Sequence, residues 1–311
     1  MAHKKILITG GAGFIGSHLA QEASYDGLNV VVLDNLSSGK PENLNGLNNI
    51  EIIEQDIRNA DFINKLFARE KFDLVFHEAA IASVQKSISD PKNTYNVNVT
   101  GTNNIFKAAL DNGVEKVVFA SSAAVYGNDP LLPKKEIYTP RPVSPYGQHK
   151  LENENTAKKL SAKKKTDFVA LRYFNVFGER QDPDSEYSGV ISIFMNKISK
   201  DLPINIYGDG QQTRDFIYVK DIVKANFLAA EINTDSFSSF NVGTGIQTSI
   251  LEMAKIIYKS YQKKEQINFL PGRKGDIKHS LADITAIKTY LDFFPEWQVA
   301  SGIDQIVKHN G

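Results

Sequence analysis

A glycine-rich turn near the amino terminus constrains this chain more than any other feature of its sequence. The apolar run Lys5–Thr9 predicts a strand, and Gly10, Gly13 and Gly16 follow it at the start of a helical pattern. In such a unit the first glycine permits a tight turn, the second lets the backbone approach a pyrophosphate, and the third lets helix and strand pack closely. The helix start also offers free N–H groups to phosphates. We therefore predict a Rossmann-type dinucleotide site.

A carboxylate follows the glycine turn by about twenty residues, the usual spacing in such sites. Asp34 ends the second predicted strand, where an acidic side chain can bind both hydroxyls of an adenosine ribose. The same charge repels a 2′-phosphate, and no arginine follows nearby, so the sequence predicts NAD rather than NADP. Asp56 and Ile57 close the third strand at the same edge, where an adenine would lie. Asp56 suits a helix cap equally well, and both roles can hold.

Short β-rich runs alternate with longer helical stretches through the first half of the chain, which is typical of a parallel sheet covered on both faces. The predicted strands are Lys5–Thr9, Val30–Leu33, Ile50–Gln55, Leu74–His77, Val117–Ser121 and Val169–Tyr173. We predict an α/β fold with a Rossmann-type doubly wound parallel sheet over residues 1–175.

The rhythm changes after about residue 175, where Pro, Gly, Asp and Tyr become frequent. Helical patterns return at Asp221–Glu231, Ser249–Gln262 and Asp283–Leu291. We predict that residues 176–311 form a smaller α/β substrate-binding domain, whose segments can interleave with the first.

The bulk composition excludes several classes of function. The chain of 311 residues has no cysteine, which rules out disulfides, thiolate catalysis and cysteine metal sites. Its 36 Lys and Arg balance 36 Asp and Glu, so the net charge does not favour nucleic acid or an acidic membrane. No apolar run approaches membrane-spanning length, and the start has no signal-peptide pattern. No His, Asp and Glu cluster has metal-ligand spacing. We predict a soluble cytoplasmic protein with no metal.

Tyr146 and Lys150 lie four residues apart, which places both on one face of a helix. An adjacent ammonium lowers a tyrosine pKa from its usual value near 10, so that Tyr146 can accept a hydroxyl proton during hydride transfer. The pair alone occurs by chance; it gains weight because Ser122 precedes it at the carboxyl edge of a predicted strand, where ligands bind. Ser122 can hydrogen-bond the same oxygen, although a turn or cap role is the alternative. His77 reads as a packed strand-end residue.

Together these motifs resemble the extended short-chain dehydrogenases/reductases, and among them the UDP-hexose 4-epimerases. The resemblance covers essentially the whole chain and rests on residues 10–16, 34–36, 98–102, 122–127, 172–175 and 213–216, with Tyr146 and Lys150. It implies an isomerase in which Ser122 and Tyr146 face the sugar 4-hydroxyl and Lys150 holds the nicotinamide ribose. Sugar C4 would be oxidised to a ketone and, after the sugar turns over, reduced on its other face, with tightly bound NAD.

Motifs and resemblance together give the predicted contacts. Those to NAD are Gly10, Gly13, Phe14, Ile15, Gly16, Asp34, Asn35, Asp56, Ile57, Ala79, Ala80, Asn98, Tyr146 and Lys150. Those to the UDP-sugar are Ser83, Ser122, Tyr146, Asn175, Val190, Asn205, Tyr207, Arg214, Arg273, Asp276 and Ser280. The resemblance implies Arg214 and Arg273 at the diphosphate, where a surface ion pair is the alternative. It implies Asp276 at the ribose, and Asn205 with Tyr207 at the uracil.

Two positions narrow the reaction. Related 4,6-dehydratases and UDP-glucuronate decarboxylases carry an acidic residue just after the catalytic Ser or Thr, and this chain has Ala123 and Ala124 there. That departure favours simple epimerisation. Ser280 aligns with a family position beside the sugar 2-substituent, where a small residue leaves room for an N-acetyl group. The resemblance therefore implies UDP-GlcNAc and UDP-GalNAc as substrates, as well as UDP-Glc and UDP-Gal.

Two other functions stay open. One is a UDP-glucuronate 4-epimerase or another sugar-nucleotide oxidoreductase. The other is a non-catalytic NAD(H)-sensing module, although such sensors usually lose the Tyr–Lys pair.

The helical pattern from about Asn93 to Leu110 has two apolar faces, one with Tyr95 and Phe106 and one with Val97 and Ile105. One face can meet the core and the other a partner, which predicts a homodimer. A helix buried within one subunit is the alternative.

Overall fold

The computed structural model describes residues 5–163, 165–182, 189–232, 236–272 and 277–310. The chain divides into two compact units, each built from separate segments of the sequence. The first unit comprises Met1–Asp129, Thr139–Arg172 and Val223–Phe240, and the second comprises Pro130–Tyr138, Tyr173–Ile222 and Asn241–Gly311. Segments from both halves of the sequence therefore contribute to each unit.

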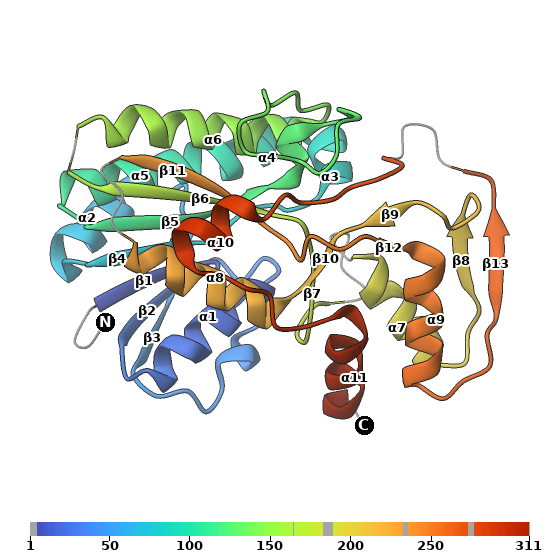
Figure 1. Cartoon of the computed structure of the whole chain (residues 1–311). Coiled ribbons are helices and arrows are strands. Elements are labelled where there is room, and N and C mark those ends of the chain that lie inside the picture. The colour runs from blue at the N-terminus through green and yellow to red at the C-terminus, as the bar shows by residue number, and fades with distance from the viewer. Residues whose placement is uncertain (1–4, 164, 183–188, 233–235, 273–276, 311) are drawn as a thin grey trace. The chain divides into compact units, whose positions relative to one another are not determined.

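A seven-stranded sheet in the order β11-β6-β5-β4-β1-β2-β3 forms the centre of the first unit (Figure 1). Its strands are β1 Lys5–Thr9, β2 Asn29–Asp34, β3 Ile50–Glu54, β4 Leu74–His77, β5 Lys116–Ser122, β6 Asp167–Tyr173 and β11 Phe237–Val242. The four pairs from β3 to β5 are all parallel. The strand order reverses between β1 and β4, and in doubly wound sheets ligands bind outside the carboxyl ends at that point. The predicted Rossmann-type fold is confirmed.

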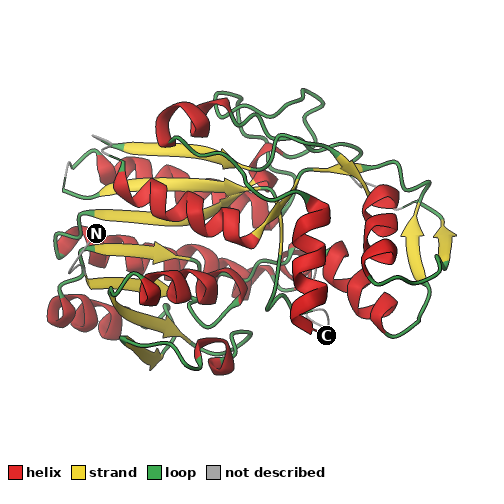
Figure 2. Cartoon of the chain, turned by 60° about the horizontal axis from the view of Figure 1, so that its bottom comes forward, coloured by secondary structure: helices red, strands yellow, loops and turns green. Residues whose placement is uncertain are grey.

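Helices cover both faces of this sheet (Figure 2). They are α1 Phe14–Tyr25, α2 Ala60–Glu70, α3 Val84–Ser89, α4 Pro91–Tyr95, α5 Thr102–Asp111, α6 Pro145–Ser161 and α8 Val219–Glu231, with a π-helical turn η2 Asn96–Gly101 and short 3-10 turns η1 Pro41–Leu44 and η3 Ala123–Tyr126. Helices α2, α5 and α6 pack on one face, because one buried cluster joins them to β1, β2, β4 and β5.

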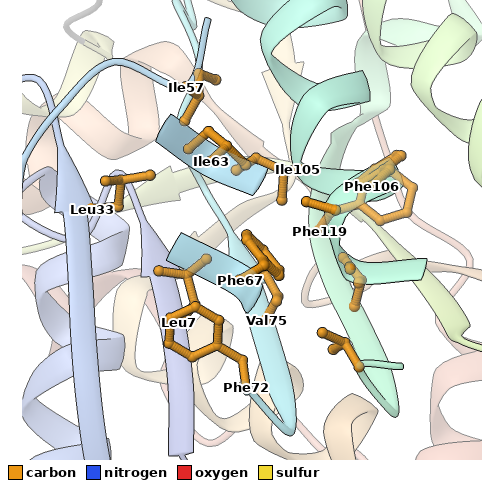
Figure 3. Packing of buried hydrophobic residues seen from close by; sticks show 14 of the residues in the cluster. Leu7, Leu33, Ile57, Ile63, Phe67, Phe72, Val75, Ile105, Phe106 and Phe119 are labelled. Carbon is orange, nitrogen blue, oxygen red and sulfur yellow. The ribbon is translucent and has the colours of Figure 1, made fainter. Parts of the chain in front are cut away.

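Alternation along each strand builds this cluster. Leu7 and Val75 point from β1 and β4 toward α2 and α5, where Phe67 and Phe106 meet them (Figure 3). The ring of Phe106 lies 5.0 Å from that of Phe119 and 5.1 Å from that of Phe168, centroid to centroid. Residues of opposite parity face the other side, where the Phe76 ring contacts Phe227 of α8. A sheet buried on both faces explains its unbroken apolar runs.

The second unit contains short strand pairs and helices. Its strands are β7 Asn175–Phe177, β8 Ile204–Tyr207, β9 Thr213–Arg214, β10 Phe216–Tyr218, β12 Thr248–Ser249 and β13 Ile267–Leu270, and its helices are α7 Val190–Ser199, α9 Ile250–Ser260, α10 Thr285–Leu291 and α11 Val299–Asn310. β7 pairs with β10, β9 with β12, and β8 with β13. Within the described ranges of the chain, no helix is long and apolar enough to cross a membrane.

The structure does not leave an apolar face of the helix at 93–110 free for the predicted homodimer contact. Residues 91–111 form α4, η2 and α5 in succession, and both apolar faces of α5 are buried inside the chain: Ile105 and Phe106 have no exposed surface. The reason is that α5 lies between α2 and α6 on the sheet. Only Tyr95, 41% exposed, keeps a large apolar surface outside. Two apolar faces on this helix therefore carry no argument for a partner.

Truncation of Phe106 tests the central role of this cluster. Phe106→Ala should lower the free energy of unfolding by about 3–5 kcal/mol, because it leaves a cavity where three other rings meet. Urea denaturation followed by circular dichroism measures the change. Tyr25→Ala, at a ring 71% exposed on α1, is the matched control and should change stability by less than about 0.5 kcal/mol. Equal losses in the two variants would contradict this account of the core.

Candidate active site

The predicted glycine turn connects β1 to α1 at the point where the sheet reverses. Gly10 has φ +69°, and a Cβ there would lie 2.7 Å from the backbone nitrogen of Ala79, just after β4. A Cβ on Gly16 would overlap the carbonyl oxygen of Gly10. Both positions therefore require glycine for packing, the first also for its left-handed backbone.

Gly13 differs from these two glycines. Its φ is −78°, and a Cβ there would meet only the Gly10 carbonyl oxygen, at 3.2 Å. It is the N-cap of α1, no side chain caps the helix, and Phe14 and Ile15 are half-buried in the first turn. Within the protein a side chain at 13 thus meets one tight contact, fewer than at Gly10 or Gly16, and the open backbone with uncapped N–H groups fits a pyrophosphate.

Asp34 lies at the end of β2 and is nearly buried. Its carboxylate accepts hydrogen bonds from the backbone N–H groups of Ala12, at 3.0 Å, and Leu36, at 2.9 Å. Burial raises the pKa of Asp34, and the two backbone hydrogen bonds lower it. Each carboxylate oxygen keeps acceptor capacity, so the side chain fits a ribose diol beside the glycine turn.

Asn35 and Asp56 bond to each other at the ends of β2 and β3. The Asn35 amide donates to Asp56 at 2.9 Å, and Arg58 donates to the same carboxylate from its backbone and its guanidinium. These bonds to Arg58 lower the pKa of Asp56 to about 2. The helix-cap alternative for Asp56 is wrong, because Asn59 caps α2 by accepting from the Phe62 N–H.

Ile57 and Asn98 hold the neighbouring backbone. Ile57 is a core residue packed against Gly101. The buried Asn98 amide accepts from the Ile81 N–H at 2.7 Å and donates to the Ile81 carbonyl at 3.0 Å, which fixes the segment that contains half-buried Ala79 and Ala80. Ser83, at the end of this segment, caps α3 through the Lys86 N–H.

His77 occupies the end of β4 as a packed residue. Its Nε2 lies 2.9 Å from Thr102 Oγ1, which itself donates to the Asn98 carbonyl, so Nε2 carries the proton. Its Nδ1 lies 2.6 Å from Thr9 Oγ1. Burial lowers the pKa of His77 to about 3, with a smaller contribution from the charge of Lys150. The neutral ring thus links β1, β4 and α5.

Ser122, Tyr146 and Lys150 come together at the carboxyl edge of β5. Ser144 caps α6 by accepting from the Gly147 N–H, and a Cβ on Gly147 would lie 2.6 Å from the Ala124 carbonyl oxygen. That close approach brings the first turn of α6 against the residues after β5. The side chains of Tyr146 and Ser122 hydrogen-bond. Lys150 Nζ lies 5.7 Å from the centre of the Tyr146 ring and donates to the Ala120 carbonyl at 2.7 Å.

The prediction that Lys150 lowers the pKa of Tyr146 is wrong when only the groups of the protein are considered. Burial raises the pKa of Tyr146 to about 12; the Ser122 hydrogen bond lowers it, and the charge of Glu78 raises it. Burial also lowers the pKa of Lys150, while Glu78 and Glu154 raise it. Desolvation therefore outweighs the cation on the same helix face.

The predicted substrate residues that the structure describes beyond residue 172 lie in the second unit. Asn175 starts β7, Val190 starts α7, and Asn205 and Tyr207 belong to β8. Asn205 and Tyr207 share one face of the β8–β13 pair, where the Asn268 amide donates to Asn205 Oδ1 at 3.2 Å. Arg273 and Asp276 lie outside the described residues.

Arg214 and Ser280 are local neighbours in the second unit. The Thr213 carbonyl oxygen accepts from Arg214 Nη1 at 2.8 Å and from the Ser280 N–H at 3.1 Å. Both side chains are half-buried.

The sequence reasoning missed the residues that support these positions. Asp215, next to Arg214, is fully buried and accepts four hydrogen bonds, from Thr244, Gly245 and Ala282. In the first unit, Glu154 and Arg172 form a buried ion pair. Glu154 follows Lys150 by four residues, so the helical period that selected Tyr146 and Lys150 also indicated it. Within the described part of the chain, no three His, Asp or Glu side chains gather as they would around a metal ion.

A glycine turn on β1, an acidic residue ending β2, and a Ser–Tyr–Lys group beside β5 define an NAD-binding Rossmann protein with a short-chain dehydrogenase/reductase site. Comparison with known proteins narrows this class. The model of the NAD dependent epimerase/dehydratase family matches residues 6–243, and the chain belongs to that family.

Individual relatives extend over the full chain. A putative UDP-glucose 4-epimerase of Methanocaldococcus jannaschii is 38% identical, with 97% of each chain covered. A UDP-N-acetylglucosamine 4-epimerase of Methanobrevibacter ruminantium, solved with UDP-N-acetylmuramic acid, is 41% identical, has a TM-score of 0.94 and covers 99% of this chain and 98% of its own. A UDP-glucose 4-epimerase of Thermotoga maritima, solved with UDP-glucose, is 36% identical with a TM-score of 0.94 and 98% of each chain covered. The predicted resemblance, isomerase class and dependence on NAD are confirmed.

Alanine at two glycines separates cofactor binding from folding. Gly13→Ala should keep the thermal midpoint within a few degrees but weaken NAD binding by about tenfold or more, because its Cβ meets only one protein atom and faces the phosphates. Gly16→Ala should destabilise the fold itself, because the new Cβ overlaps the Gly10 carbonyl. Differential scanning calorimetry and equilibrium NAD binding measure the two effects. A Gly13→Ala protein with unchanged NAD affinity would rule out the phosphate position assigned to this turn.

Proposed function

We propose that this protein interconverts UDP-hexoses that differ in configuration at C4, with NAD as a tightly bound cofactor. The observation that carries the proposal is the convergence of Ser122, Tyr146 and Lys150 beside β5 in a unit whose glycine turn and Asp34 fit a dinucleotide. The full-length similarity to UDP-glucose and UDP-N-acetylglucosamine 4-epimerases supports it.

The protein side of the reaction follows from this geometry. Tyr146 holds the proton at the sugar 4-oxygen: it accepts this proton when C4 is oxidised to the ketone and returns it when C4 is reduced on the opposite face. Ser122 hydrogen-bonds with Tyr146 and orients the same oxygen. Lys150, buried and bonded to Ala120, supplies a positive charge beside Tyr146. Bound NAD supplies a hydride acceptor and donor.

NAD also bears on the high pKa of Tyr146. When oxidised nicotinamide is bound in this site, its positive charge would favour the Tyr146 phenolate, opposite in sign to the effects of burial and Glu78. The residues that would hold the cofactor are Gly13 and Asp34, with Lys150 at the nicotinamide ribose. Because oxidation and reduction of the sugar cancel, the cofactor is regenerated in each cycle and needs no exchange.

Removal of the Tyr146 hydroxyl tests this assignment. Tyr146→Phe should lower kcat by about 10²–10⁴, the usual contribution of a positioned acid–base group, and leave KM for the UDP-sugar within about threefold. The assay offers UDP-glucose or UDP-N-acetylglucosamine without added cofactor and follows the C4 epimer by chromatography. Tyr138→Phe, at a phenol outside the Ser122–Tyr146–Lys150 group, is the control and should retain activity. A Tyr146→Phe enzyme with wild-type kcat would refute the role.

For the sugar, we propose that both N-acetylated and plain UDP-hexoses are substrates. The small side chain of Ser280 lies next to Arg214 through their common partner Thr213, and the resemblance assigns Ser280 to the sugar 2-substituent. A UDP-N-acetylglucosamine 4-epimerase and a UDP-glucose 4-epimerase are both among the similar structures, which supports a broad substrate range.

Enlarging Ser280 tests the proposed sugar subsite. Ser280→Tyr should lower kcat/KM for UDP-N-acetylglucosamine by about tenfold or more relative to UDP-glucose, because a ring there fills the space for the acetamido group. Ser280→Ala keeps the position small and should leave the ratio near the wild-type value. Parallel kinetic assays on both substrates give the ratio. An unchanged ratio in Ser280→Tyr would refute the placement of Ser280.

The alternatives give different results in the same assay. Turnover of UDP-glucuronate alone would support a glucuronate 4-epimerase; a structure with UDP-glucuronic acid and NAD, 32% identical, is also similar to this chain. No turnover of any UDP-sugar would favour an NAD(H)-sensing module. The homodimer and the cytoplasmic location stay predictions, the first open to light scattering.

A further inference from the structure

A buried polar group that the proposed mechanism does not use lies directly beneath the Ser122–Tyr146–Lys150 site. Its centre is Glu154, one helical turn after Lys150 on α6 and only 4% exposed. The Glu154 carboxylate accepts from Ser121 Oγ at 2.5 Å, and from Arg172 Nε at 2.9 Å and Nη2 at 2.7 Å. Arg172 lies near the end of β6 and is also buried.

Three successive residues of β5 are tied to three residues of α6. Lys150 binds the Ala120 carbonyl, Glu154 binds Ser121, and Tyr146 binds Ser122. The three α6 residues stand at intervals of four, so they form one row on the helix. The Glu154–Ser121 bond lies at the end of this row away from Tyr146, and Ser121 directly precedes Ser122 in β5.

Arg172 extends the connection to the turn after β5. Its Nη1 donates to the Tyr126 hydroxyl at 2.9 Å, and the guanidinium carbon lies 5.1 Å from the centre of that ring. Burial disfavours the charge of Arg172, but the hydrogen bond and charge of Glu154 outweigh burial and raise its pKa. Tyr126 ends η3, the turn that begins directly after Ser122. The ion pair thus binds both sides of the Ser122 turn to α6.

The charge of Glu154 also acts on Lys150. The titratable groups that face Lys150 are Glu78 and His77 at the end of β4, and Tyr146, His149 and Glu154 on α6; β5 contributes the neutral Ala120 carbonyl. His77 is held neutral, so Glu78 and Glu154 are the anions of this group. Because burial disfavours a protonated lysine, the charges of these two carboxylates oppose burial and raise the pKa of Lys150.

A buried ion pair gives little net stability, because desolvation offsets the attraction. Its presence under this site therefore calls for another explanation. We propose that Glu154 is a positioning residue for the reaction: its bonds to Ser121 and Arg172 fix the Ser122 turn against α6, and its charge keeps Lys150 protonated at working pH. The inference rests on the proposed function for the reaction that it serves.

The sign of the pH effect follows from these contacts. Loss of the Glu154 charge lowers the pKa of Lys150, so Lys150 loses its proton at a lower pH and the alkaline limb of kcat moves down. Glu154→Gln keeps the shape and can still accept from Ser121. Its alkaline limb should fall by about one pH unit, with kcat at pH 8 about tenfold lower and KM for the UDP-sugar within about twofold.

Two further variants separate this role from stability. Ser121→Ala removes one hydrogen bond and no charge, so its alkaline limb should match the wild type. The double variant Glu154→Gln/Arg172→Met also removes the guanidinium that has lost its carboxylate, so the thermal midpoint should recover relative to Glu154→Gln, while the limb stays below the wild-type position. The proposal would be overturned if the double variant recovered both its thermal midpoint and its alkaline limb. It would also be overturned if the alkaline limb of Glu154→Gln coincided with that of the wild type.

A direct titration makes the result independent of catalysis. Protein labelled with ¹³C at lysine Cε, with the Lys150 signal assigned by its absence in Lys150→Arg, reports protonation of Lys150 by NMR. The pKa of Lys150 should be lower in Glu154→Gln than in wild type, and an equal pKa would overturn the proposal. If the wild type converts no UDP-hexose, the proposed function fails, whereas this titration still decides whether Glu154 keeps Lys150 charged.

Discussion

The near-contact of backbone with backbone at the reversal point of the sheet is the constraint on which the first unit depends. Gly16 lies against the Gly10 carbonyl, and Gly10 lies against the backbone of Ala79, so the turn after β1, the start of α1 and the segment after β4 meet without intervening side chains. A Cβ at Gly16 would force the start of α1 away from the turn, and a Cβ at Gly10 would collide with the backbone after β4. The same packing leaves the Gly13 backbone and the first turn of α1 open, which is where phosphates bind.

A second glycine contact positions the side chains of Tyr146 and Lys150 beside Ser122. Gly147 brings α6 against the Ala124 carbonyl, and from that position one row of helix residues meets the last three residues of β5. The ionisable side chains in this row are buried, so the protonation state of each depends more on its charged neighbours than on solvent. Burial has the largest effect at both side chains: it raises the pKa of Tyr146 and lowers that of Lys150, and the nearby carboxylates oppose it at the lysine. In the protein alone the pKa of the Tyr146 phenol is therefore high, although Lys150 lies beside it.

The sequence predicted the sheet well because its central strands, such as β1, β2 and β4, are buried on both faces and therefore mostly apolar. Lys5–Thr9 and Leu74–His77 have the predicted bounds, and the others differ by at most two residues at each end. β11 was missed, since Phe237-Ser238-Ser239-Phe240 mixes serine with phenylalanine and follows a helix far from the other strands in sequence. The two-faced interpretation of residues 93–110 failed because periodicity cannot show that α5 lies between α2 and α6 on the sheet, where both apolar faces are buried.

Site residues were predictable where a motif fixes them, as with Gly10, Asp34, Tyr146 and Lys150. The spacing of four places Glu154 on the same helix face, but the contacts of Glu154, Arg172 and Asp215 were not predictable, because their partners are distant in sequence. A helix cap was one of two roles expected for Asp56, and that cap belongs to Asn59, three residues later, since both residue types suit either position.

Asp34 combines a structural role with its predicted contact to the ribose, and this combination bears on the choice of dinucleotide. Its carboxylate accepts from two backbone N–H groups: Oδ2 from Ala12 in the glycine turn, and Oδ1 from Leu36 in the loop after β2. Gly39 packs against Oδ2. The residue that we expect to discriminate against a 2′-phosphate therefore also ties the glycine turn to the loop after β2. Preference for NAD in this chain is built into the architecture of the turn, so a change of coenzyme would demand a rebuilt loop and not a single exchanged side chain.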